Sequence, residues 1–102
     1  MSKSRLSLQE KLEEILGERR VYFQPPASVR MTYPAIVYFR NRIHNRQANN
    51  AVYNQTDEYT VTVIDKYPDS DIVRKVSQLP MCQHDRHYTA DNLNHDVFTI
   101  YY

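Results

Sequence analysis

The sequence predicts a single small domain, residues 1–102, in which helices and β-strands are mixed. Residues 59–65 alternate β-branched and aromatic side chains with threonine, which is typical of a central strand covered on both faces. Pro68 then ends the strand because it has no N–H to donate. Asp69 and Ser70 follow with side-chain oxygens that can cap the free amides of a helix. At 102 residues, the chain is long enough for one hydrophobic core.

A helix over residues 1–17 is expected at the start of the chain. Ser7 and Glu10 have the spacing of a capping box, although Ser4 could start the helix one turn earlier. Gly17, the only glycine, stands where a left-handed C-terminal cap is needed. The apolar side chains have the helical spacing of a single stripe that lies on a sheet: Leu8, Leu12, Ile15 and Leu16.

Two strands are expected next. Residues 21–23 form a short strand, which Pro25 and Pro26 end because proline cannot continue a ladder. Residues 33–40 form a longer strand that we expect to be covered on both sides. Its apolar side chains alternate between the two faces, Ile36 and Tyr38 on one and Val37 and Phe39 on the other.

A polar arm or loop is expected over residues 41–58, where the apolar pattern disappears. The pattern leaves three interpretations open: a solvated loop, the far end of a long hairpin, or an arm that contacts a neighbouring subunit or nucleic acid. Tyr53 favours contact with a partner. In an extended chain, alternate residues share one face, which here would carry Arg40, Arg42, His44 and Arg46.

The last third of the chain predicts a helix, a turn and a strand. The helix begins at Asp69 or Ser70 and ends before Pro80, with an apolar stripe of Ile72, Val73, Val76 and Leu79. Residues 81–88 have no clear pattern. Residues 91–94 read as a turn, and residues 95–102 alternate as a strand that must be paired or covered.

Charge and composition exclude several classes of protein. Thirteen Lys and Arg against twelve Asp and Glu give a formal net charge of +1, without the basic excess of a dedicated duplex-binding protein. One glycine cannot build a glycine-rich phosphate loop, and one cysteine cannot form an internal disulfide. No apolar run approaches the roughly 20 residues that span a bilayer, so we expect no membrane partner.

The segment around Cys82 resembles a metal or nucleophile site but lacks the required pattern. The spacing of Cys82, His84 and His87 is not a zinc signature, and on a regular strand His87 would point away from the other two. A cysteine–histidine nucleophile also needs a third, orienting group. We therefore predict no enzyme, with no catalytic, cofactor-binding or metal-binding residue.

Five short stretches together form a recognisable order along nearly the whole chain. They are Ile15-Leu16-Gly17, Val21 to Pro26, Tyr33 to Tyr38, Tyr59 to Asp65 with Pro68-Asp69-Ser70, and Ala90 to His95 leading into Val97 to Tyr102. In this order the chain resembles the small tail-terminator, or tail-completion, proteins of long-tailed, non-contractile bacteriophages. None of the stretches is a catalytic motif.

The resemblance implies an α+β fold, a small mostly antiparallel β-sheet with two helices packed on one face. It implies a structural virion protein that forms a homo-oligomeric ring, a hexamer in this family. The ring caps the tail tube protein, ends tail polymerisation and joins the tail to the head–tail connector or stopper protein. Phage DNA would pass through the ring without specific recognition. The protein would occupy the tail or neck region of the virion, and the host cytoplasm during assembly.

Two alternatives have different partners. One is another neck component, a head–tail adaptor or stopper. The other is a small module that binds single-stranded nucleic acid through a basic and aromatic face, made of Arg40, Arg42, Arg46, Tyr38 and Tyr53. For subunit or partner contacts in a ring, the predicted interface residues are Arg42, Arg46, Tyr53, Tyr101 and Tyr102.

Overall fold

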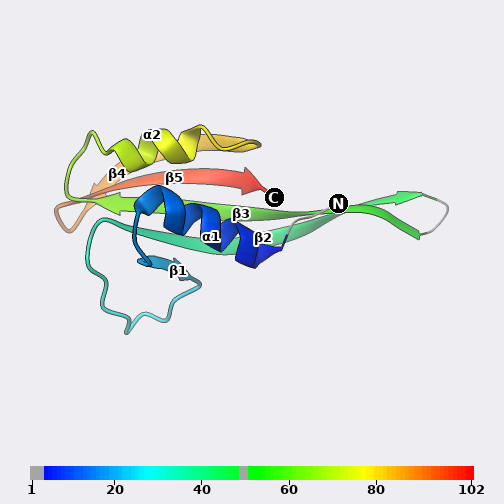
Figure 1. The fold of residues 1–102 in the computed structure, drawn as a ribbon, viewed down its shortest axis with the longest axis horizontal. Helices are drawn as coiled ribbons and strands as arrows, with labels where there is room; N and C mark the ends of the chain where they lie inside the picture. Colours follow the sequence, from blue (N-terminus) through cyan, green and yellow to red (C-terminus); the bar gives the residue numbers. More distant parts are fainter. Residues whose placement is uncertain (1–3, 49–50) are drawn as a thin grey trace.

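The predicted α+β fold is confirmed: a five-stranded, mostly antiparallel sheet carries two helices on one face (Figure 1). The computed structural model describes residues 4–48 and 51–102, and the side chains of residues 4–46 and 55–102. Neither helix in these ranges is long and apolar enough to cross a membrane. The elements in chain order are α1 (Arg5–Leu16), β1 (Val21–Phe23), β2 (Ala35–Ala48), β3 (Ala51–Asp65), α2 (Asp71–Ser77), β4 (Cys82–Ala90) and β5 (Leu93–Tyr101).

The strand order across the sheet is β1-β2-β3-β5-β4. β1 runs parallel to β2, and the other three pairings are antiparallel. β3 therefore lies in the middle of the sheet, as its pattern predicts. β5 lies between β3 and β4, so the last predicted strand is paired on both sides. β4 contains most of the segment that had no clear pattern in the sequence.

The hydrophobic core lies between the helices and one face of the sheet. Leu8 and Leu12 of α1 and Val76 of α2 are fully buried there. The strands supply alternate residues to the same layer, because only every second side chain of a strand points to one face. Those residues are Val21, Ile36, Tyr38, Tyr59, Val61, Val63, Phe98 and Ile100.

The opposite face of the sheet carries neither of the two helices. Val37 is nearly buried, because it lies between Tyr22 and Thr62 of the neighbouring strands. Phe39, two residues further along β2, is 44% exposed. The prediction that residues 33–40 are covered on both sides is therefore wrong at Phe39. We call this surface the helix-free face.

Ser4 is the N-cap of α1, one turn before the predicted capping box, and residues 1–3 of the predicted helix lie outside the described residues. The side-chain oxygen of Ser4 accepts a hydrogen bond from the backbone N–H of Ser7 at 3.2 Å. The capping box of Ser7 and Glu10 is wrong, because the Ser7 hydroxyl instead lies 2.6 Å from the hydroxyl of Tyr102. That bond ties the first turn of α1 to the end of the chain.

The other helix boundaries agree with the sequence. Gly17 has φ 80°, a left-handed conformation, and its N–H donates to the carbonyl oxygen of Glu13 at 2.8 Å, so the predicted C-cap is confirmed. Ser70 caps α2 by accepting from the N–H of Ile72 at 3.3 Å. The predicted turn is shorter than expected. Only Asp91 and Asn92 have positive φ, and residues 93 and 94 are already paired in β5.

Candidate interaction surfaces

β2 and β3 extend beyond the body of the domain as a paired hairpin, which we call the arm, residues 41–58 (Figure 1). Pairing runs from Arg42 opposite Glu58 to Ala48 opposite Ala51. The interpretation as a long hairpin is therefore confirmed, and the interpretation as a solvated loop is wrong. The principal extents of the molecule are 51 × 27 × 23 Å, and the arm lies along the longest of them.

A bulge at the base of the arm separates Arg40 from the cations that follow it. Arg40 lies opposite Tyr59, whereas Arg42 lies opposite Glu58, with a register shift between the two pairs. Tyr59 and Glu58 are adjacent on β3, so they point to opposite faces of the sheet. Arg40, opposite Tyr59, therefore points to the helix side, and Arg42, opposite Glu58, points to the helix-free side. The prediction that four cations share one face is therefore wrong. The three that share the helix-free side of the arm are Arg42, His44 and Arg46.

Arg40 is held in a network inside its own chain. Its Nε lies 3.1 Å from Oδ2 of Asp57, and its Nη2 donates to the Tyr59 hydroxyl at 3.4 Å. The Tyr59 hydroxyl in turn donates to Asp57 Oδ2 at 3.1 Å. The hydrogen bond to Tyr59, with a smaller contribution from Asp57, raises the pKa of Arg40. Arg40 therefore fixes the base of the arm.

Glu58 organises the other side of the base. His44 Nε2 lies 2.9 Å from Glu58 Oε1, and the Asn41 amide donates to Glu58 Oε2 at 3.1 Å and to Thr60 Oγ1 at 2.6 Å. The hydrogen bond from His44, followed by that from Asn41, lowers the pKa of Glu58. The ring of Tyr101 lies 5.7 Å from the ring of His44. The carboxylate thus links the bulge, the arm and β5.

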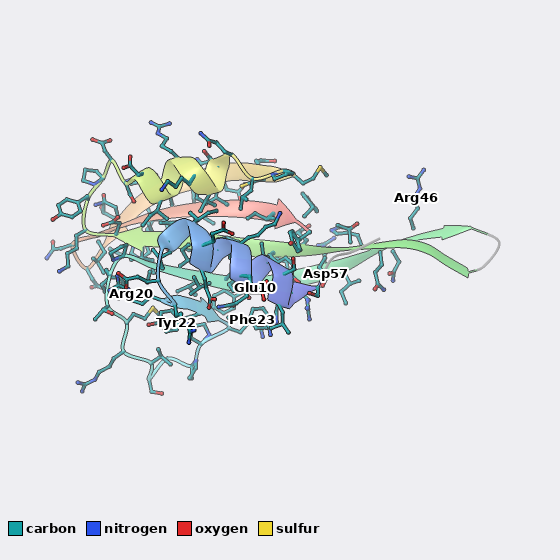
Figure 2. The ribbon with its side chains drawn as sticks, viewed as in Figure 1. Glu10, Arg20, Tyr22, Phe23, Arg46 and Asp57 are labelled. Atoms are coloured by element: carbon teal, nitrogen blue, oxygen red, sulfur yellow. The ribbon has the colours of Figure 1, made fainter. Side chains whose placement is uncertain are left out.

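The predicted interface cations are exposed on the arm. Arg46 extends from the outer part of the arm, away from the body (Figure 2). Among the residues whose side chains the structure describes, neither Arg42 nor Arg46 forms an ion pair. Tyr53 lies on β3 within the arm, and its side chain is outside the described residues. Arg42 lies opposite Glu58, and Arg46 lies further out on the arm, opposite Asn54.

The two predicted C-terminal contacts lie at the base of the arm and are half-buried. Tyr102 exchanges two backbone hydrogen bonds with Asp57, at 2.9 and 3.2 Å, and its hydroxyl contacts Ser7. Tyr101 lies beside His44. The structure therefore brings Tyr101 and Tyr102 close to the start of the arm and leaves Arg46 far along it.

Tyr38 does not contribute to a basic and aromatic face. It is fully buried in the core, where its hydroxyl donates to Gln9 and accepts from Arg5 Nη1 at 3.0 Å. Burial raises the pKa of Tyr38. A buried ring cannot stack on a base, so the proposed nucleic-acid face loses this aromatic residue.

His84 and His87 converge on one buried carboxylate, contrary to the sequence prediction that His87 points away. The Nε2 atom of His84 and the Nδ1 atom of His87 lie 3.0 and 2.9 Å from Oδ1 of Asp96. A bulge between His84 and Arg86 shifts the register of β4, so His84 and His87 point to the same side. The sequence does not predict this arrangement, because no residue in the segment is specific for a bulge.

A cavity of about 500 Å³ lies beside this cluster, between α2 and β4. Ser70, Arg74 and Ser77 line it together with the two histidines and Asp96. Among the described residues, no group of three or more histidine, cysteine or acidic side chains has the arrangement that holds a metal ion.

Burial, with a smaller effect of Asp85, raises the pKa of the Cys82 thiol to about 11. This thiol is therefore protonated, and a poor nucleophile, near neutral pH.

A second, apolar groove of about 210 Å³ lies where α1, the end of α2 and the end of β5 meet. Leu8, Leu79, Met81, Ile100 and Tyr102 line it, and Met81 is 70% exposed. This groove could not be predicted, because its residues come from segments that are far apart in the sequence. Searches with the sequence found no protein-family model and no curated protein that matches this chain.

Proposed function

We propose that this chain is a structural subunit of a phage neck ring, a hexamer that caps the tail tube and ends tail polymerisation. The ring then joins the tail to the head–tail connector. In this function the protein acts by assembly and catalyses no reaction. The DNA passes through the ring without base-specific contacts.

The arm is the observation that carries this proposal. Two strands of the sheet continue out of the body, and the described side chains of residues 41–46 and 55 are exposed and, apart from Ile43, polar. Every side chain of residues 41–46 is exposed, so this part of the arm contributes little to the stability of the isolated domain. An extension of this kind is accounted for by contact with another molecule. The α+β fold with helices on one face also agrees with the resemblance to tail terminators.

A ring also requires two different patches on each subunit, because each contact joins one patch to the other. The chain offers different surfaces on its two sides. The helix side carries the apolar groove with exposed Met81, and the helix-free face carries exposed Phe39 and Tyr88. This asymmetry supports head-to-tail assembly.

Electron microscopy of particles assembled without this protein tests the proposal. Overlong tails without heads are expected, because nothing would stop tube growth, and supplying the wild-type chain should restore tail length. Tails of normal length beside unjoined heads would instead assign the protein to the connector side of the neck, as an adaptor or stopper. Normal, joined particles would reject every virion role.

A module that binds single-stranded nucleic acid is the second candidate, and exposed Arg42 and Arg46 favour it. If these cations contact phosphates, affinity for a single strand should fall steeply as salt is added. An R42E/R46E chain should then bind much more weakly than wild type. Absence of measurable binding at low salt would dismiss this candidate.

A further inference from the structure

We propose that the arm of one subunit docks, through Arg42 and Arg46, on the acidic outer face of α1 in a second copy of this chain. This inference rests on the proposed ring and names the two surfaces that meet in it. The acceptor surface is defined by Glu10 and Glu14.

The acceptor surface follows from the way α1 packs. Leu8 and Leu12 are fully buried against the sheet. Glu10 and Glu14 are one helical turn apart and exposed, on the side of α1 that faces away from the sheet. Neither glutamate forms an ion pair among the side chains that the structure describes. Two carboxylates without an ion pair therefore lie side by side, with Lys11 and Lys75 beside Glu14 at the edge of this surface.

The donor surface carries the opposite charge in a similar arrangement. Arg42 and Arg46 are exposed and four residues apart on the same side of a strand. The acids at the base of the arm are already engaged: Asp57 with Arg40 and Glu58 with His44. Arg42 lies opposite Glu58 at the base, and its charge helps to lower the pKa of that carboxyl, whereas Arg46 lies further out, opposite Asn54. The arm therefore presents positive charge that is strongest beyond its base.

The two surfaces cannot meet within one molecule. Glu10 lies on α1 over the sheet, whereas Arg46 lies far out on the arm, beyond the end of the body (Figure 2). The arginines also point to the helix-free side, and the glutamates lie on the outer side of the helix layer. Complementary patches on opposite sides of a molecule produce head-to-tail contacts, in which the helix layer of one copy faces the helix-free side of the next.

Disulfide trapping tests this contact directly. In a C82S chain, which has no other cysteine, Glu14→Cys and Arg46→Cys are made singly and together. After mild oxidation of the purified protein at high concentration, the double variant should form a ladder of linked chains, because each contact joins one position to the other. Each single variant should remain monomeric. A double variant without a ladder, or a single variant that forms dimers, would overturn the proposal.

Charge reversal tests the energetic contribution. R42E/R46E and E10K/E14K should each weaken self-association roughly 10-fold, since two exposed ion pairs become repulsive. Mixing the two variants should restore association, because the acidic arm of R42E/R46E then meets the basic helix of E10K/E14K. The unchanged basic arm of E10K/E14K likewise meets the unchanged acidic helix of R42E/R46E. Arg30→Glu, at another exposed cation, is the matched control and should have little effect. A mixture no stronger than either variant alone would contradict the proposal and assign the arm to a different partner.

These outcomes are distinct from those of the tail-length experiment. Overlong tails without a disulfide ladder would support the terminator function and reject this contact. A disulfide ladder with normal tails would support the contact and reject the function.

Discussion

His44 and Glu58 face each other across the base of the arm, with 2.9 Å between Nε2 and Oε1. Asn41, the bulge residue, donates to the other oxygen of the same carboxylate. One side chain of β3 thereby contacts two side chains of β2, three residues apart, at the point where the hairpin leaves the body.

Glu58→Gln should reduce the acid sensitivity of the protein. Hydrogen bonds hold the pKa of Glu58 below its usual value, so its ionised form favours the folded state. This contribution is present above the unfolded-state value of about 4.3, and is lost as the pH falls through the lowered pKa of the folded state. Urea unfolding at pH 7 and near pH 3 should show a smaller loss of stability for the variant. An equal loss in both proteins would exclude this role.

Leu12→Ala should destabilise the domain by about 2–5 kcal/mol, because it leaves a cavity between α1 and the sheet. Leu6, on the same helix, is 62% exposed, so Leu6→Ala is the matched control and should change stability by no more than about 0.5 kcal/mol. Denaturant unfolding followed by circular dichroism measures both. Similar losses would mean that the burial of α1 differs from the structure described here.

Cys82 should react slowly with thiol reagents while the protein is folded. Its pKa is raised to about 11, against about 8.5 for a free thiol, so the thiolate fraction at pH 8 falls by roughly 100-fold or more. The rate of reaction with a disulfide reagent, compared in buffer and in denaturant, gives the ratio. A folded protein that reacts as fast as the denatured chain would show that the thiol is neither buried nor protonated.

Loss of either His84 or His87 should cost little stability, because the other still donates to Asp96, whereas loss of both should cost much more. Leucine at either position keeps the bulk and leaves one hydrogen bond to the buried carboxylate. The H84L/H87L chain leaves that carboxylate without either donor and should lose about 1–3 kcal/mol more than the sum of the single changes. Adding Asp96→Asn should recover part of this loss, because a neutral amide is less costly to bury. Strict additivity would contradict the cluster.

The parts of the fold that could be predicted are those that bury apolar side chains in a regular pattern. Leu8 and Leu12 repeat at helical spacing, and Val61 and Val63 alternate, because each pair faces the same core. Ser70 and Gly17 mark helix ends through backbone chemistry that few other residues supply.

The arm and β4 could not be predicted in this way. Residues 41–46 and 83–90 are exposed, so no alternation of apolar side chains reports that they are strands. They are strands because they pair with a neighbouring strand: residues 41–46 with β3, and residues 83–90 with β5. One bulge places Arg40 and Arg42 on opposite faces, and the other brings His87 to Asp96. Neither bulge could be predicted from the sequence, since both depend on the partner strand. The proposed contact of Arg42 and Arg46 with a second copy involves another molecule, so the pattern of one chain cannot report it.

The position of β5 also determines when the sheet can be completed during synthesis. β4 pairs only with β5, and β5 fills the edge of β3 that β2 leaves free. When the chain has emerged from the ribosome only up to Ala90, β3 is an open edge of the β1-β2-β3 sheet and β4 has no partner strand. Such an edge invites pairing with other nascent chains. Emergence of Leu93–Tyr101 covers this edge of β3 and gives β4 its partner in the same step.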